Sequence, residues 1–128
     1  MKDCIFCKIG SGEIPSMKIW EDDNFFAFLD NNPIREGHAL VIPKKHTGYI
    51  FDLDDKDYSD LMLTSKKIAD ILKKKLNSKR IGILVEGFGV DHVHVHLVPI
   101  DNGGEVCLQY AKPASKEQLE KIADKILK

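Results

Sequence analysis

Three histidines, His92, His94 and His96, alternate with apolar residues along one short segment. Because successive side chains of a β-strand point to opposite faces, this spacing predicts that the three imidazoles share one face, about 7 Å from one to the next. Three ordinary core histidines are a poor explanation, since every buried ring would need a polar partner. The pattern favours either a polyhistidine metal site or a nucleophilic histidine flanked by supporting histidines.

A second group of reactive side chains lies near the N-terminus. Cys4 and Cys7 are separated by two residues, and the chain holds three cysteines in all. An odd count argues against a disulfide framework, and in a reducing compartment this spacing favours a metal-binding or redox pair. The residues alone also allow two unligated core cysteines, so that alternative stays open.

Hydrophobic periodicity predicts the elements that must position these residues. Asp3 can cap a short helical turn over residues 4–9, which Gly10 and Gly12 would end. Short apolar or aromatic runs bounded by turn residues predict strands, the first two joined as a hairpin. The expected strands are residues 17–21, 25–29, 38–42, 81–85 and 92–98.

Two longer helices complete the expected fold. Apolar residues recur at spacings of three and four over about residues 54–77, which predicts an amphipathic helix. Ser115 with Gln118 forms a capping-box pattern at the start of a C-terminal helix. We therefore expect an antiparallel α+β domain of about five strands with one long crossover helix, spanning residues 1–128. Its core would cover about 3–100, with an appendage at 101–128 that carries a helix from about 115.

Composition excludes several classes of protein. The chain has 128 residues, 43% hydrophobic and 30% charged, which is typical of one globular domain. Nineteen Lys and Arg against twenty Asp and Glu exclude the strong positive field of a dedicated nucleic-acid binder. The longest apolar runs fall far short of the roughly 20 residues of a membrane helix, and no signal-peptide segment follows Met1. We expect a cytoplasmic protein whose partners include neither nucleic acid nor a membrane.

The segment 92–98, His-Val-His-Val-His-Leu-Val, resembles the motif of the histidine triad (HIT) superfamily of nucleotide hydrolases and transferases. Further motifs occur in the order seen in its Hint-like branch, so that the resemblance covers about residues 3–100. These motifs are residues 4–9, 13–15, 20–22, 26–30 and 37–46.

The resemblance implies a reaction and its catalytic residues. His94 matches the nucleophile, which attacks the α-phosphorus of a nucleoside phosphate and forms a covalent nucleotidyl-histidine that water then cleaves. His96 and His38 match the histidines that flank the phosphate, and His96 is the candidate for proton delivery to the leaving group. His38 has an alternative role as a turn residue after Gly37. The implied substrate is a purine nucleoside monophosphate joined to a second group, as in a dinucleoside polyphosphate or a phosphoramidate.

The resemblance also implies how the nucleoside is held. Asp30 matches the acidic residue that accepts hydrogen bonds from the ribose hydroxyls, and Asn31 lies at the neighbouring position. The residues that match the apolar walls around the purine are Ile5, Phe6, Ile9 and Phe28. Packing in the core is nearly as good an account of Ile9 and Phe28. No organic cofactor is implied.

Many bacterial relatives that resemble this chain bind a structural zinc ion with two cysteines and two histidines. Those residues match Cys4, Cys7, His46 and His92, a donor set that suits a closed tetrahedral site. His92 would then serve the metal and leave His94 and His96 for chemistry. The resemblance further implies a homodimer.

The loop before the triad departs from the family pattern. It is shortened to residues 86–91, and Glu86 stands where Asn is usual, so an anionic group would repel a phosphate unless it points away or binds a cationic leaving group. Gly87 and Gly89 either let backbone N–H groups approach the phosphate or simply form a tight turn. The leaving group therefore stays open. So do a nucleotidyltransferase, a zinc-stabilised nucleotide-binding module, and a hydrolase whose catalytic metal is held by the three triad histidines.

Overall fold

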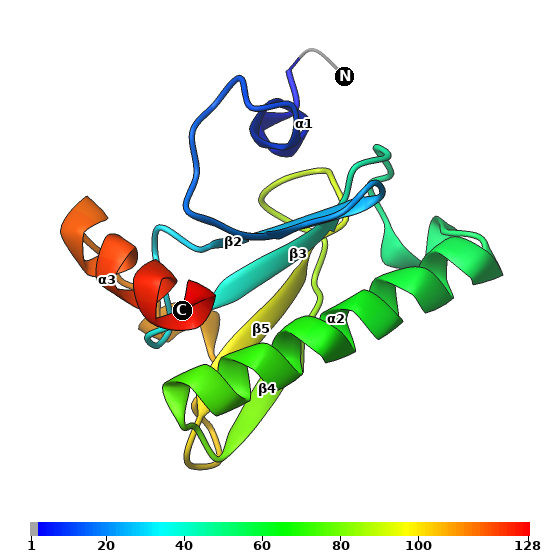
Figure 1. Ribbon diagram of the computed structural model, residues 1–128. Helices are drawn as coiled ribbons and strands as arrows, with labels where there is room; N and C mark the ends of the chain where they lie inside the picture. The colour runs from blue at the N-terminus through cyan, green and yellow to red at the C-terminus, as the bar shows by residue number, and fades with distance from the viewer. Residues whose placement is uncertain (1–2) are drawn as a thin grey trace.

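The computed structural model describes residues 3–128, which form a five-stranded antiparallel sheet in the order β1-β2-β3-β5-β4 (Figure 1). Consecutive strands β1, β2 and β3 pair as neighbours, whereas β4 reaches the far edge of the sheet through a helical crossover. The strands are β1 (Lys18–Glu21), β2 (Phe25–Leu29), β3 (Ala39–Pro43), β4 (Arg80–Leu84) and β5 (Val95–Ile100).

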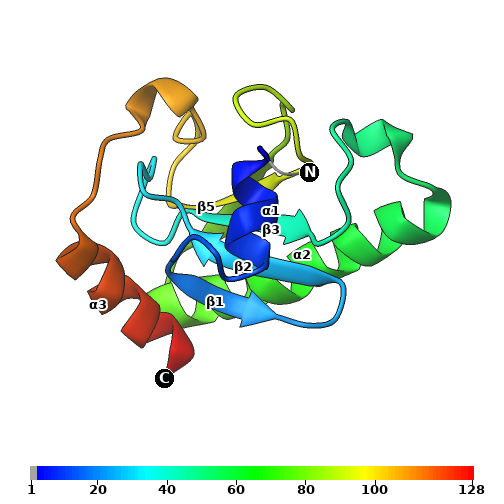
Figure 2. The ribbon, with the colours of Figure 1, turned by 90° about the horizontal axis from the view of Figure 1, so that it is seen from above.

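Helices cover both faces of this sheet. The long crossover helix α2 (Asp55–Leu76) and the C-terminal helix α3 (Lys116–Leu127) lie on one side, and the short helix α1 (Ile5–Gly10) lies on the other (Figures 1 and 2). Two 3-10 turns, η1 (Ile50–Asp52) and η2 (Leu108–Tyr110), interrupt the connections. The predicted α+β fold is confirmed. No helix within residues 3–128 is both long and apolar enough to cross a membrane.

The two faces of the sheet bury separate apolar clusters, which is why β2 and β3 are apolar at every position. Alternate side chains such as Ala27 and Val41 pack toward α2, and the intervening Phe26, Phe28 and Leu40 pack toward α1. Both strands are buried at every position, so the two ends of the loop that joins them are fixed in the core.

Capping residues fix both ends of α2 and the start of α3. Asp54 accepts the N–H of Asp57 at 2.7 Å, and Asn77 ends α2 in the left-handed conformation with φ of 53°. At α3, Ser115 and Gln118 form both bonds of the predicted capping box. The buried positions of α3 join the α2-side core and so anchor the C-terminal segment; these are Leu119, Ala123 and Ile126.

Two sequence predictions are wrong in detail. Asp3 does not cap α1; Cys4 is the N-cap, and its Sγ accepts the N–H of Cys7 at 3.4 Å. The triad strand begins at Val95 and not at His92, because β3 pairs with β5 only as far as Val95. The backbone before it is held by the Thr47 carbonyl, which accepts the N–H of Val93 at 2.7 Å.

Candidate active site and metal centre

Cys4, Cys7, His46 and His92 converge from three separate parts of the chain, and their ligand atoms all lie within 4.8 Å of one another. We call these four residues the Cys/His cluster. Nδ1 of His92 lies 3.3 Å from Sγ of Cys4 and 3.4 Å from Sγ of Cys7, and Nδ1 of His46 lies 3.4 Å from Sγ of Cys7. Ligands of a tetrahedral zinc ion with ordinary Zn–S and Zn–N bonds stand about 3.5 Å apart, so the spacing fits that ion.

Hydrogen bonding around the Cys/His cluster also fits a metal. Nε2 of His92 lies 2.7 Å from the carbonyl oxygen of Pro43, which can only accept, so Nε2 carries the proton and Nδ1 keeps its lone pair toward the thiols. Burial raises the pKa of the Cys7 thiol, and the neighbouring Cys4 thiol adds to this effect. A divalent cation would reverse it, because thiolates are the form that binds metal.

His94 lies beside the Cys/His cluster but points elsewhere. Its Nδ1 lies 2.7 Å from the carbonyl oxygen of His92, so Nδ1 donates and the lone pair of the neutral ring is on Nε2. The ring of Phe6 packs edge-on against it, with centroids 5.1 Å apart. This contact and the backbone bond fix the orientation of a ring whose Nε2 is free to act as a nucleophile.

His38 and His96 form a buried pair, with Nε2 of His38 2.9 Å from Nδ1 of His96. The backbone N–H of Ile34 donates to Nδ1 of His38 at 3.0 Å, so the proton of neutral His38 must be on Nε2. That proton is donated to Nδ1 of His96, which places the proton of His96 on its own Nε2. Burial, assisted by the neighbouring rings, lowers the pKa of His96 to about 4, and burial also lowers the pKa of His38.

Asp30 stands at the end of β2 next to this pair. Its Oδ2 lies 3.6 Å from Nε2 of His38, and its Oδ1 accepts the N–H of Asn32 at 2.8 Å. Asp30, His38 and His96 thus form a second convergent group. It suits a metal poorly, because His38 uses its Nδ1 lone pair for Ile34, and only an imidazolate could then also bind a metal through Nε2.

The three triad histidines do not converge on one point. In residues 3–128, the two convergent groups of ligand side chains divide the triad, with His92 in one group and His96 in the other. This arrangement disfavours a hydrolase whose catalytic ion is held by His92, His94 and His96.

Most residues expected at the purine wall are covered. Phe6, Ile9 and Phe28 are buried in the α1-side cluster, so that core packing accounts for much of their surface, whereas Ile5 is 45% exposed. Asn31 is exposed on the loop after Asp30. Of the four predicted wall residues, Ile5 therefore offers a free apolar surface and Phe6 offers its contact with His94.

The loop before β5 lies beside α1 (Figure 2). Gly87 and Gly89 have φ of 86° and 85°, a backbone conformation that favours glycine. Glu86 is exposed, and Phe88 is 84% exposed at the tip of the loop. Their positive φ explains why glycine suits both positions, and their backbone N–H groups remain candidates for phosphate contact.

Sequence reasoning missed the groups that determine which nitrogen of each histidine ring carries the proton. They are backbone groups: the carbonyls of Pro43 and His92 and the N–H of Ile34. Every residue except proline has the same N–H and C=O, so no residue type could have pointed to them. Among side chains, Arg35 carries no signal in the sequence, because its partners lie far away along the chain.

Comparison with known proteins agrees with this geometry. Residues 11–103 match the HIT domain family. An uncharacterized HIT-like protein of Borreliella burgdorferi is 43% identical over 106 residues, which cover 77% of this chain and 76% of that protein. Adenosine 5'-monophosphoramidase HNT1 of Candida albicans is 41% identical over 108 residues, which cover 75% of this chain and 69% of that protein.

A solved structure extends the likeness over nearly the whole chain. The crystal structure of a Zn-bound histidine triad family protein from Mycobacterium smegmatis covers 98% of this chain and 94% of its own, with 30% identity and a TM-score of 0.81. The chain belongs to the HIT family.

Proposed function

We propose that the protein is a nucleotide hydrolase that cleaves purine nucleoside monophosphate conjugates at the α-phosphorus through a covalent nucleotidyl-histidine on His94. The observation that carries this proposal is the bond from Nδ1 of His94 to the His92 carbonyl, which leaves a lone pair on Nε2. A neutral imidazole with a free nitrogen is the form that attacks phosphorus. The relative from Candida albicans named as an adenosine 5'-monophosphoramidase supports a nucleoside phosphoramidate as one substrate class.

The reaction divides into two displacements. First, Nε2 of His94 attacks the α-phosphorus, a nitrogen–phosphorus bond forms, and the bond to the leaving group breaks. The leaving group takes the Nε2 proton of His96, and the N–H of His38 stabilises the negative charge that develops on that ring. Then water attacks phosphorus, its proton returns to His96, and nucleoside monophosphate leaves neutral His94.

The remaining predicted residues would hold the nucleoside and its phosphate. Within residues 3–128, the backbone donates to Oδ1 of Asp30 but not to Oδ2, so Oδ2 is suited to the ribose hydroxyls. Ile5 and Phe6 would contact the purine. Glu86 is exposed, and its negative charge would favour a cationic leaving group over an anionic one.

The Cys/His cluster would hold one structural zinc ion. Cys4, Cys7, His46 and His92 would hold it, and the bound ion would neutralise the two thiolates and link the start of α1 to His92, next to the catalytic ring. A homodimer working in the cytoplasm remains our expectation for the whole protein, and sedimentation or native mass spectrometry measures the oligomeric state.

A labelling experiment tests the proposed reaction. A nucleotide conjugate labelled at the α-phosphorus should leave acid-labile label on the wild-type protein, and His94→Ala should abolish both label and turnover. Lys67→Ala, on the exposed surface of α2, is the matched control and should label normally. Label that persists in His94→Ala would refute the assignment of the nucleophile.

Two other outcomes would replace the hydrolase with an alternative. Tight nucleotide binding without turnover across a panel of adenosine monophosphate conjugates would indicate a zinc-stabilised binding module. A rate that rises with inorganic phosphate, with nucleoside diphosphate as the product, would indicate a nucleotidyltransferase.

A further inference from the structure

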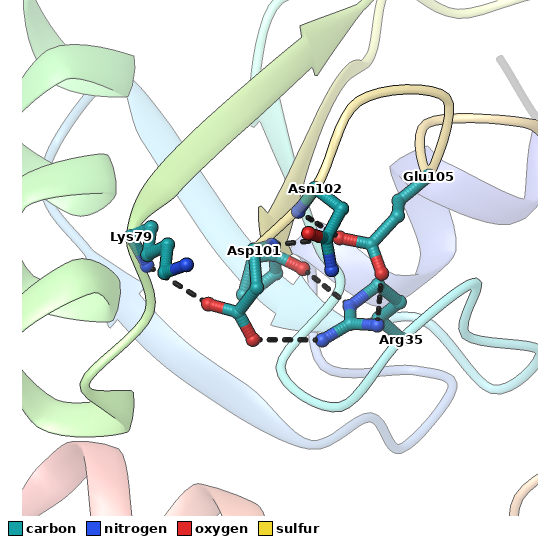
Figure 3. A network of polar contacts seen from close by, with 6 residues as sticks. Arg35, Lys79, Asp101, Asn102 and Glu105 are labelled. Carbon is teal, nitrogen blue, oxygen red and sulfur yellow. Dashed lines mark hydrogen bonds and ion pairs between the residues drawn. The ribbon is translucent and has the colours of Figure 1, made fainter.

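Arg35 lies in the loop between β2 and β3 and contacts three groups at the far end of β5 (Figure 3). Its Nε donates to the carbonyl oxygen of Pro99 at 3.0 Å. One terminal nitrogen donates to Oε2 of Glu105, and the other donates to Oδ2 of Asp101 at 3.2 Å. The planar guanidinium thus uses all of its nitrogens to tie this loop to the strand that carries His96.

The acceptors of Arg35 are themselves fixed. Oε1 of Glu105 accepts the backbone N–H groups of Asp101 and Asn102, both at 2.7 Å, and these bonds lower the pKa of Glu105. Oδ1 of Asp101 accepts the N–H of Lys79 at 3.0 Å, just before β4. Because every acceptor is held by backbone, the network is a rigid anchor and differs from a pair of mobile surface charges.

The same loop supplies two backbone groups that bond to His38. The carbonyl of Arg35 accepts the N–H of His38 at 3.1 Å, and the neighbouring N–H of Ile34 donates to Nδ1 of His38. Gly37, with φ of 85°, packs so closely that a Cβ there would overlap Leu76. The position of the Ile34 N–H therefore depends on how residues 34–37 are held, and Arg35 is their polar anchor to β5.

We propose that Arg35 is a positioning residue for proton delivery: it holds the Ile34 N–H against His38 and so keeps the proton of His96 on the nitrogen that serves the leaving group. This inference rests on the proposed function. Without Arg35, residues 34–37 would shift, and His38 would lose the bond that keeps its proton on Nε2. Negative charge developing on His96 would then lose its donor.

The consequence depends on the leaving group. An alkylamine departs from phosphorus only when it receives a proton, whereas p-nitrophenolate is stable as an anion and departs without one. Loss of Arg35 should therefore slow the first kind of substrate selectively. Simple loss of folded protein would slow both kinds equally.

The test compares two adenosine monophosphate conjugates, an alkylamine phosphoramidate and a p-nitrophenyl ester, in wild type and Arg35→Gln. A positioned general acid is worth roughly 100-fold or more, so partial misplacement should lower the single-turnover rate of the first displacement about 10-fold for the phosphoramidate and less than about 2-fold for the ester. KM should stay unchanged for both. Lys18→Gln, which breaks another partly exposed ion pair at 2.9 Å, should alter neither rate.

Two further measurements keep the proposal falsifiable if Arg35→Gln folds poorly. Glu105→Gln keeps the amide oxygen for the turn but weakens the guanidinium contact, and it should show a smaller loss of the same selectivity. Nitrogen NMR of the imidazoles should show His38 protonated at Nε2 in wild type and a mixture of tautomers in Glu105→Gln. Equal losses on both substrates, or an unchanged tautomer, would overturn the role of Arg35. Failure of wild type to turn over either conjugate would instead refute the proposed function.

Discussion

The Cys/His cluster and the histidine pair His38–His96 use the same type of side chain, imidazole, for two different purposes. Each gathers ligand atoms within 4.8 Å, so distance alone would make both into metal sites. In the first, His92 donates its outer N–H to the Pro43 carbonyl and keeps a lone pair facing the thiols. In the second, His38 accepts an N–H from Ile34 and therefore presents a proton. Backbone groups behind each ring distinguish a metal ligand from a proton donor.

The strongest test of this comparison removes the thiols. Cys4→Ser with Cys7→Ser should reduce bound zinc from about one per chain to none and lower the free energy of unfolding by at least about 3 kcal/mol, because structural zinc contributes directly to folding. Elemental analysis and urea unfolding measure these quantities. If wild-type protein purified from a zinc-supplemented medium contained no zinc, the comparison would fail.

The converse substitution is made in the histidine pair. His96→Asn should lower kcat on an alkylamine phosphoramidate by about 100-fold, since it removes a proton donor. Zinc content should equal that of wild type, because His96 is outside the Cys/His cluster. Loss of zinc in this variant would mean that the two regions are not independent.

Acid should destabilise the protein through His96. Its folded pKa of about 4 lies below the unfolded value of 6.5, so the unfolded state binds more protons between these values and stability falls as pH drops from 6.5 toward 4. The loss is about 2 kcal/mol, which is less than the full shift because solvent still reaches the ring. Urea unfolding at several pH values should show a smaller loss in His96→Asn. Parallel curves for the two proteins would contradict the low pKa.

The smallest effect is expected far from both histidine groups. Ser115→Ala removes the hydroxyl that accepts the backbone N–H of Gln118 in the α3 capping box, and it should lower the free energy of unfolding by about 1 kcal/mol. Zinc content and kcat at 25 °C should not change. A change in either would show that α3 is coupled to the site.

Much of the fold could be read from local patterns. The short aromatic-rich run in 25–29, the spacing of three and four in 54–77 and the Ser115–Gln118 pair each predict an element that the structure contains. The start of β5 was misplaced because period-two alternation continues through residues 92–94, where the Val93 N–H already bonds to Thr47 outside the sheet. Side-chain pattern reports which face a residue occupies, whereas strand limits depend on the partner backbone.

Residue types alone determined which side chains could do chemistry: imidazoles, thiols and a carboxylate, in an order typical of one family. Tertiary structure alone decided the protonation of each ring, since this depends on whether a carbonyl or an N–H lies behind it. Those groups come from Ile34, Pro43 and His92, and chain folding brings the first two against histidines elsewhere in the sequence. The physical reason is that backbone polar groups are identical along the chain, so their positions, and not their identities, carry the information.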